Sequence, residues 1–230
     1  MRNEKNIWYF EDVDLYSVFC PHRQKRIGSE HEYTTLKKGE FVYFQNEPST
    51  MVYLIAKGRV KIGTYSNDGK EVIKAVLSPG EIFGEMAILG EEKRRDFAQA
   101  LEELTLCPLN VEDMECMMQE NQDFSLKVTR LIGFKLKRAE RKIESLVFKD
   151  ARTRVIEFLA EMATRDGQKV GYETLVKYFY THQDIANLTA TSRQTVTTIL
   201  NELRDKNLIN FDRKRLLIRD VTKLEEELLQ

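Results

Sequence analysis

Short runs of apolar residues separated by polar turn signals dominate residues 33–111. The runs EFVYF, MVYLIAKGRVKIGTY and EVIKAVL are bounded by KKGE, NEPS, SNDGKE and SPGE. Runs of this length and spacing predict the strands of a compact antiparallel barrel or sandwich. The Asp68-Gly69 pair predicts a hairpin, and three more glycines stand where tight turns are needed: Gly39, Gly58 and Gly80. For residues 1–32 we expect helical turns that pack on the barrel.

The apolar spacing changes to a helical period between about Gln119 and Phe148. Apolar positions follow one another at intervals of four, three, four and three residues: Ile132, Leu136, Ala139, Ile143 and Leu146. This spacing is typical of a coiled-coil seam and predicts that two copies pair along the helix. Because the seam covers only about two heptads, an amphipathic helix lying on its own barrel stays open as an alternative.

From Asp150 onward the pattern predicts a second, mainly helical region. A helix in ARTRVIEFLAEMATRDG ends at Asp166-Gly167. A loop, two short helices and the hairpin LINFDRKRLLI are expected to follow. The two short helices lie within THQDIANLTATSRQTVTTILNELRDKNLI.

Two helix starts can be placed in this stretch. Thr181 can cap the first helix, with Asp184 in its first turn and two apolar residues facing inward, Ile185 and Leu188. Thr191, followed three residues later by Gln194, forms a capping box for the second helix. The second helix has an apolar stripe at i, i+3, i+4 and i+7: Val196, Ile199, Leu200 and Leu203. Two helices joined by so few residues predict a helix-turn-helix.

The face of the second helix opposite this stripe carries residue types that read bases in the major groove: Arg193, Gln194, Thr197, Thr198 and Asn201. Arginine can donate two hydrogen bonds to guanine, glutamine matches adenine, and threonine offers a hydroxyl or a methyl group. A merely solvated face would carry more Glu and Lys. If the last hairpin is a wing, the cations at its tip would reach phosphates, and otherwise they belong to a plain exposed turn: Arg213, Lys214 and Arg215.

Composition and charge set limits on this picture. The 230 residues are 42% hydrophobic and 32% charged, as in a globular protein, and no apolar run predicts a membrane span or signal peptide, so we expect a cytoplasmic location. The net charge is −1, yet Lys and Arg number 8 against 2 Asp and Glu in residues 127–149, and 13 against 13 in residues 150–230. A neutral C-terminal region can still present a basic face to phosphates, because binding depends on where the charges lie.

The cysteines and histidines form no metal-binding pattern. The cysteines are scattered and unpaired in sequence, and the histidines lack HxxxH or HExxH spacing: Cys20, Cys107, Cys116, His22, His31 and His182. We therefore expect reduced thiols and no metal site. No nucleophile–base pairing, P-loop or dinucleotide fingerprint predicts an enzyme.

Two stretches resemble a known family. LSPGEIFGEMAIL resembles the turn and short helix of a cyclic-nucleotide-binding barrel, and TSRQTVTTILNELRDKNLI resembles the recognition helix of Crp/Fnr-type transcription regulators, the family of the cyclic-AMP receptor protein. The resemblance implies an α+β chain: an N-terminal antiparallel β-barrel (a cyclic-nucleotide-binding-like jelly roll), a long dimerisation helix and a C-terminal winged helix-turn-helix. It implies a sensor barrel at 1–118, the dimerisation helix at 119–148 and the DNA-binding domain at 149–230.

The resemblance further implies a homodimer on double-stranded DNA with a pseudo-palindromic site, and it allows RNA polymerase as another partner. Arg193 matches the family arginine that contacts guanine. Gln194 stands where a glutamate usually reads the neighbouring base, and Thr198 where the cyclic-AMP protein has a second arginine. The preferred bases should therefore differ, with a change in binding free energy of ~1–3 kcal/mol per position. Thr181, His182 and Gln183 match the phosphate-contacting start of the first helix. The expected DNA contacts are Thr181, His182, Gln183, Ser192, Arg193, Gln194, Thr197, Thr198, Arg213, Lys214 and Arg215, and the seam residues are the expected dimer interface.

The resemblance also indicates a degenerate effector cassette. In nucleotide-binding members an arginine and N–H groups hold the phosphate, a hydroxyl residue assists, and a glutamate takes the ribose hydroxyl. Gly84, Glu85 and Arg95 keep these places, but Asp96 replaces the hydroxyl residue. A carboxylate about 4 Å from the phosphate would cost about 4 kcal/mol at an effective dielectric constant of about 20. An alignment shifted by one residue would put Arg94 in the place of Arg95.

The long helix also argues against cyclic AMP, because the family's adenine-contacting Thr-Ser pair aligns with Ala139 and Glu140, which have no hydroxyl group. We therefore expect that cyclic AMP is not the effector and that Arg95 pairs with Asp96 or a neighbouring acid such as Glu92. A different small anion, a hydrophobic ligand or no ligand stay open, whereas haem or an iron–sulfur cluster has little support. No cofactor is expected.

The competing interpretation is a sensor or scaffold whose C-terminal domain binds a protein partner instead of DNA. The cluster of Arg193, Gln194, Thr197 and Thr198 on one helix face argues against it.

Overall fold

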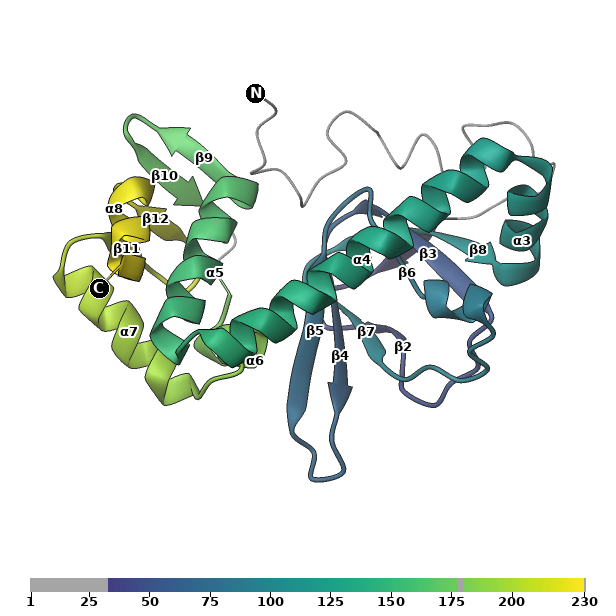
Figure 1. Cartoon of the computed structure of the whole chain (residues 1–230), viewed down its shortest axis with the longest axis horizontal. Helices are drawn as coiled ribbons and strands as arrows, with labels where there is room; N and C mark the ends of the chain where they lie inside the picture. Colours follow the sequence, from purple (N-terminus) through teal and green to yellow (C-terminus); the bar gives the residue numbers. More distant parts are fainter. Residues whose placement is uncertain (1–32, 178–179, 230) are drawn as a thin grey trace. The chain divides into compact units, whose positions relative to one another are not determined.

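The computed structural model describes residues 33–177 and 180–229, and the chain divides into two compact units (Figure 1). The units are Met1–Arg138 and Ala139–Gln230, called here the N-terminal and C-terminal units. The division falls within a long helix, α4 (Gln122–Phe148). The helical turns expected in residues 1–32 lie outside the described residues.

Two four-stranded antiparallel sheets form the described part of the N-terminal unit, with strand orders β1-β8-β3-β6 and β2-β7-β4-β5. Strands distant in sequence lie side by side, which is the arrangement of a jelly roll and confirms the expected fold. The two sheets stay separate and do not close into a barrel. The strands are β1 (Thr34–Leu36), β2 (Phe41–Tyr43), β3 (Met51–Lys57), β4 (Val60–Tyr65), β5 (Glu71–Leu77), β6 (Ile82–Phe83), β7 (Phe97–Ala100) and β8 (Leu104–Asn110), and a short helix, η1 (Glu85–Leu89), follows β6.

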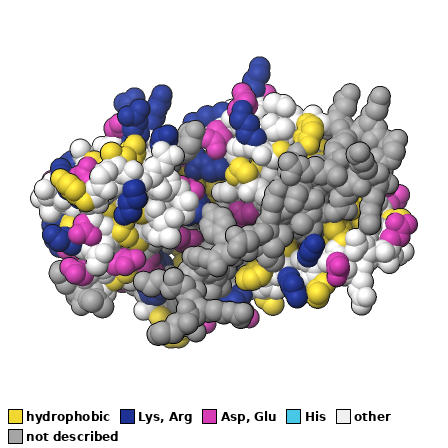
Figure 2. All heavy atoms as spheres, turned by 90° about the horizontal axis from the view of Figure 1, so that it is seen from above, with side chains coloured by type: hydrophobic (Ala, Val, Ile, Leu, Met, Phe, Trp, Pro, Cys, Tyr) yellow, Lys and Arg dark blue, Asp and Glu magenta, His cyan; other side chains and the backbone are white. Residues whose placement is uncertain are grey.

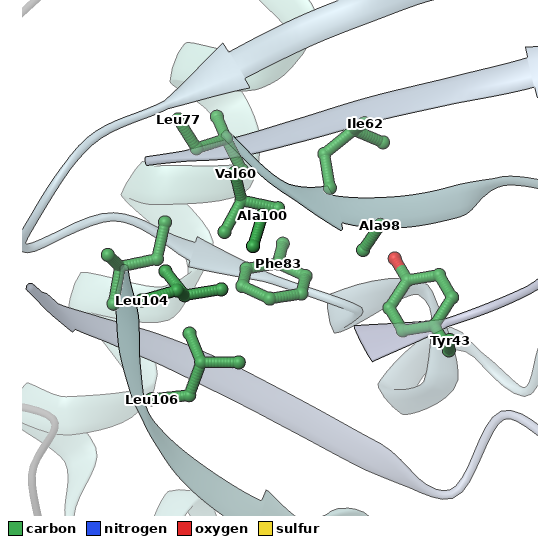
Figure 3. Packing of buried hydrophobic residues seen from close by; sticks show 10 residues of the cluster. Tyr43, Val60, Ile62, Leu77, Phe83, Ala98, Ala100, Leu104 and Leu106 are labelled. Atoms are coloured by element: carbon green, nitrogen blue, oxygen red, sulfur yellow. The ribbon is translucent and has the colours of Figure 1, made fainter. Parts of the chain in front are cut away.

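Side chains from both sheets meet in one apolar core, drawn in Figure 3 around Phe83. Phe83, Val60 and Leu104 are almost completely buried. The glycine turns predicted from the sequence are confirmed by positive φ angles at Gly39, Gly58, Gly69 and Gly80. At Gly58 a Cβ atom would lie 2.3 Å from the carbonyl oxygen of Glu103, so the β3–β4 turn has no room for a side chain.

The first half of α4 packs on its own sheet. Phe124, Val128 and Leu131 of this helix, with Met114 of α3 (Val111–Glu120), are buried against β3, β6 and β8. The alternative of a helix lying on its own barrel is therefore correct for this half. The expected single helix from Gln119 is instead two helices, because Asn121 has an extended backbone and its side chain accepts a hydrogen bond from the Phe124 amide at 3.1 Å.

In the C-terminal unit, helices surround a third four-stranded sheet, of order β11-β12-β10-β9. Its first helix starts at the predicted place, where the Asp150 side chain accepts a hydrogen bond from the Thr153 amide at 2.7 Å. The elements are α5 (Ala151–Asp166), β9 (Gly167–Val170), β10 (Glu173–Val176), α6 (His182–Thr189), α7 (Arg193–Asp205), β11 (Ile209–Phe211), β12 (Leu216–Ile218), α8 (Val221–Glu226) and η2 (Glu227–Leu229).

The β9–β10 hairpin stands where a loop was expected, and that prediction was wrong. The chain passes directly from α5 into β9 at Gly167, where a Cβ atom would lie 2.1 Å from the carbonyl oxygen of Ala163. β10 is paired on both sides, with β9 and with β12. This pairing stabilises a segment that is too short and too polar for its own sequence to predict a strand. None of the described helices is long and apolar enough to cross a membrane.

Candidate DNA-binding interface and effector cassette

Helices α6 and α7 form the predicted helix-turn-helix. Thr181 caps α6 as expected, accepting a hydrogen bond from the Asp184 amide at 3.1 Å. The cap of α7 is Ser192, whose hydroxyl accepts from the Thr195 amide at 3.0 Å, so the capping box placed at Thr191 was wrong by one residue. Both residues are good caps, and the geometry of the preceding turn decides between them.

An arginine of α5 holds that turn. Ala190, the last residue before the turn, has a left-handed backbone with φ 50°. The guanidinium of Arg154 donates to the carbonyl oxygens of Thr189 at 2.8 Å and Ala190 at 3.2 Å. These bonds satisfy carbonyl groups that the end of α6 leaves without helical partners, so α5 fixes the angle between α6 and α7.

The two faces of α7 differ as predicted. The apolar stripe Val196, Ile199, Leu200 and Leu203 is buried. Arg193, Gln194 and Thr198 are exposed on the surface, whereas Thr197 and Asn201 are half-buried. The exposed side of α7 therefore offers one guanidinium, one amide and one hydroxyl to a ligand.

Thr197 also makes bonds within the protein. Its hydroxyl donates to the carbonyl oxygen of Arg193 at 2.9 Å and lies 2.9 Å from Nδ1 of His182. The His182 ring lies edge-on to Phe211 of β11, with centroids 5.7 Å apart. These contacts connect the first turn of α6 to α7 and to the last hairpin, and no sequence pattern predicts them.

The last hairpin has the cationic tip that was expected. Asp212 folds the tip by accepting hydrogen bonds from the amides of Lys214 at 2.7 Å and Arg215 at 2.8 Å. These backbone bonds hold the pKa of Asp212 below its ordinary value. The side chains of Arg213, Lys214 and Arg215 are exposed and extend from a structured turn.

The end of the described chain is tied to α5 and α7. Arg152 of α5 forms ion pairs with Glu202 of α7 at 2.6 Å and with Glu227 at 2.7 Å, and Lys206 reaches Glu227 at 2.6 Å. The hydrogen bond from Lys206 lowers the pKa of Glu227, and burial opposes this while Arg152 adds to it. Figure 2 shows cations and anions interspersed on the face that it displays.

The effector cassette differs from the arrangement expected from the sequence. Gly84 has φ 79° and precedes η1, as a backbone cradle requires. The carboxylate of Glu85 is already bound, because Lys135 of α4 donates to it at 2.6 Å and to the Ile82 carbonyl at 2.8 Å. The side chain of Arg95 is 83% exposed and pairs with Glu91 at 3.0 Å, which confirms the expected pairing with a neighbouring acid, although that acid is Glu91 and not Glu92 or Asp96.

Asp96 does not face Arg95. Its carboxylate accepts a hydrogen bond from the Tyr43 hydroxyl at 3.2 Å and pairs with Lys74 at 3.1 Å. Burial raises the pKa of Tyr43, and the charge of Asp96 adds to the rise. The negative charge of Asp96 is thus partly compensated, which removes much of the repulsion expected between it and a phosphate.

Arg94 is the inward-facing arginine of the cassette. Only 3% of it is exposed, and it donates to the carbonyl oxygens of Gly84 at 3.0 Å and of Met51. Its guanidinium lies 4.4 Å from the centre of the Tyr43 ring, and its Nε has no hydrogen-bond partner among the described residues. The structure thus favours the alignment shifted by one residue, with Arg94 rather than Arg95 inside.

The second half of α4 leaves apolar side chains in solvent. Leu136 is 61% and Ile143 62% exposed, and Ala139 and Leu146 are also exposed. Ile132 differs, because it packs against the core of its own unit. Val147 and Phe148, which the seam did not include, are exposed as well. An apolar strip of this kind is typical of a surface that a partner covers.

Known families match both parts of this architecture. Residues 33–121 match the cyclic nucleotide-binding domain, and residues 153–227 match the Crp-like helix-turn-helix domain. The chain belongs to the Crp/Fnr family of transcription regulators. Among the residues described, no group of three or more His, Cys, Asp and Glu side chains could hold a metal ion.

The names of the proteins similar to this Crp/Fnr protein refer to different regulatory roles. It is 28% identical over 187 residues to a CRP-like cAMP-activated global transcriptional regulator of Mycobacterium tuberculosis, covering 81% of this chain and 84% of that protein. It is 27% identical over 211 residues to a global nitrogen regulator of Nostoc sp., covering 90% and 93%. The structure of a CooA mutant from Carboxydothermus hydrogenoformans matches with TM-score 0.75 and 28% identity, covering 94% of this chain and 96% of that one.

Proposed function

We propose that this Crp/Fnr protein binds a pseudo-palindromic DNA site as a homodimer and reads its sequence with α7. The observation that carries this proposal is the exposed set of Arg193, Gln194 and Thr198 opposite a fully buried apolar stripe. Arginine suits guanine, and an amide suits adenine. Thr181, His182 and Gln183 at the start of α6 and the cations at the tip of the last hairpin would contact phosphates.

A second copy of the chain would cover the apolar strip of α4. Leu136 and Ile143 are seven residues apart, so they recur on one side of the helix as coiled-coil positions do. A dimer would also present two recognition helices, one to each half of a palindromic site. In this assignment residues 1–118 form the sensor, 119–148 the dimerisation helix and 149–230 the DNA-binding domain, and RNA polymerase is a further partner.

We infer that cyclic AMP is not the effector, for a reason other than the repulsion by Asp96. The carboxylate of Glu85, which would take the ribose hydroxyl, is bound to Lys135. In addition, Ala139 and Glu140 stand where the family has hydroxyl residues. Arg94 still offers a cation to another effector, although it already donates to two backbone carbonyls.

The test is DNA selection with the purified full chain in the absence of nucleotide. We expect an enriched palindromic sequence that Arg193→Ala no longer binds specifically, while Lys57→Ala, which removes a cation paired with Glu103 in the N-terminal unit, binds normally. Loss of binding in both variants, or in neither, would contradict the role given to α7. Titration calorimetry with cyclic AMP and cyclic GMP tests the effector, and micromolar binding would refute the inference about Glu85.

A further inference from the structure

His182 occupies an unusual position for a residue at the first turn of α6. Its ring is half-buried, with Nδ1 at 2.9 Å from the Thr197 hydroxyl of α7 and the Phe211 ring of β11 packed edge-on. Contacts from two other elements therefore fix the plane of the ring. A ring fixed in this way presents its other nitrogen, Nε2, in one direction.

Thr197 selects between the two neutral forms of the ring. Its hydroxyl has one hydrogen and lies 2.9 Å from both the Arg193 carbonyl oxygen and Nδ1 of His182. When that hydrogen is donated to the carbonyl oxygen, Nδ1 of His182 is the donor of the bond to Thr197. The neutral ring then carries its lone pair at Nε2, which has no hydrogen-bond partner among residues 33–177 and 180–229.

The protonation state decides what Nε2 can bind. With its lone pair at Nε2, a neutral ring repels the oxygen of a phosphate, whereas a protonated ring donates a charge-assisted hydrogen bond to it. Burial and the nearby charge of Arg193 lower the pKa of His182, so in the free protein the ring is mostly neutral around pH 7.

The other charged side chains around the ring are two arginines and one aspartate. Arg193 and Arg204 belong to α7, and Arg204 lies over the Phe211 ring at 5.5 Å. Asp184, on α6 itself, accepts a hydrogen bond from the Thr181 hydroxyl at 2.6 Å. Of the residue types in this cluster, histidine is the one that ordinarily changes its charge between about pH 6 and pH 8.

We propose that His182 is a proton-linked DNA contact, which takes up a proton at Nε2 when a backbone phosphate binds beside it. The proposal rests on the proposed function, because it assigns a phosphate to the start of α6. A phosphate raises the proton affinity of the ring above its value in the free protein. DNA affinity is therefore highest below the pKa of the free ring and falls as the pH rises through the pKa of the bound ring.

The test measures the dissociation constant of the full chain for its selected DNA at pH 6, 7 and 8 and constant ionic strength. Each pKa unit of increase on binding gives about tenfold tighter binding per His182, so a dimer should tighten by about tenfold or more from pH 8 to pH 6. His182→Gln should bind as weakly at pH 6 as at pH 8. His182→Arg, with a permanent charge, should bind tightly at both.

The control is the double variant His22→Gln, His31→Gln, because these are the other two histidines of the chain. It should keep the pH dependence of the natural protein. A flat profile in the natural protein, or a pH dependence that survives His182→Gln, would overturn the proposal while leaving DNA binding established. Nitrogen NMR of the free protein is independent of DNA: a neutral ring protonated at Nε2 would also overturn it, and failure to select DNA at any pH would defeat the proposed function itself.

Discussion

Replacing Lys135 by Met tests whether the ion pair between Lys135 and Glu85 stabilises the N-terminal unit. The pair Lys135–Glu85 has an N–O distance of 2.6 Å, and its side chains are 28% and 13% exposed. Removing one partner of a buried ion pair costs about 3–5 kcal/mol, and a hydrogen bond to a charged group contributes about 1.5–3 kcal/mol. Because water still reaches part of this pair, we expect a loss of about 2–3 kcal/mol in the stability of the N-terminal unit.

Amide hydrogen exchange on the full chain is the appropriate assay, since it reports on each unit separately. Exchange should accelerate in residues 82–90 and in the first half of α4. The matched control is Lys57→Met, because Lys57 and Glu103 also lie 2.6 Å apart but are both 68% exposed. Water screens an exposed pair, so this variant should change stability little. Equal effects of the two substitutions would refute the argument that burial makes the Lys135 link significant.

Three further predictions address the dimer, the core and the acid response. Ile143→Glu should convert the dimer to monomers in sedimentation, and a dimer that persists would place the interface elsewhere. Gly63→Ala puts a Cβ atom 2.6 Å from the Phe97 ring and should lower stability by about 1–3 kcal/mol in thermal unfolding, whereas Gly133→Ala, which meets nothing within 4 Å, should not. Folding lowers the pKa of Glu227. Its carboxylate therefore contributes to the free energy of unfolding above about pH 4.3, and this contribution is lost as the pH falls through the lowered pKa. Denaturant unfolding of Glu227→Gln should therefore show a deficit at pH 7 that disappears in acid.

Local patterns made parts of the fold predictable. The stripe of α7 could be read directly, because four apolar residues at a helical period specify one buried face. The turn at Gly58 could also be read, since a left-handed turn strongly favours glycine. The β9–β10 hairpin could not, because its stability comes from pairing with β12, which lies about forty residues further along the chain.

The effector cassette shows a second limit of prediction from sequence. Arg94 and Arg95 are adjacent just before β7, where the chain bends at Arg95 and Asp96, and only Arg94 is buried. A shift of one residue in an alignment therefore exchanges the buried arginine with the exposed one. The sequence contains both arginines, but the backbone of Arg94 is held by hydrogen bonds with Asn46 and Glu47, and its guanidinium by the carbonyl oxygens of Gly84 and Met51. Lys135 is harder still to find, since nothing in a basic helix distinguishes the one lysine that reaches Glu85.

Thr197 narrows the set of residues that can read DNA. Its hydroxyl lies 2.9 Å from both the Arg193 carbonyl oxygen and Nδ1 of His182, so its hydrogen is engaged within the protein. A base can reach only a remaining oxygen lone pair or the methyl group without displacing that hydrogen. Hydrogen-bond donation to bases then rests on Arg193, Gln194 and Thr198. If Thr197→Val left the selected sequence unchanged but altered the pH dependence of binding, the threonine would act through His182 rather than through the base pairs.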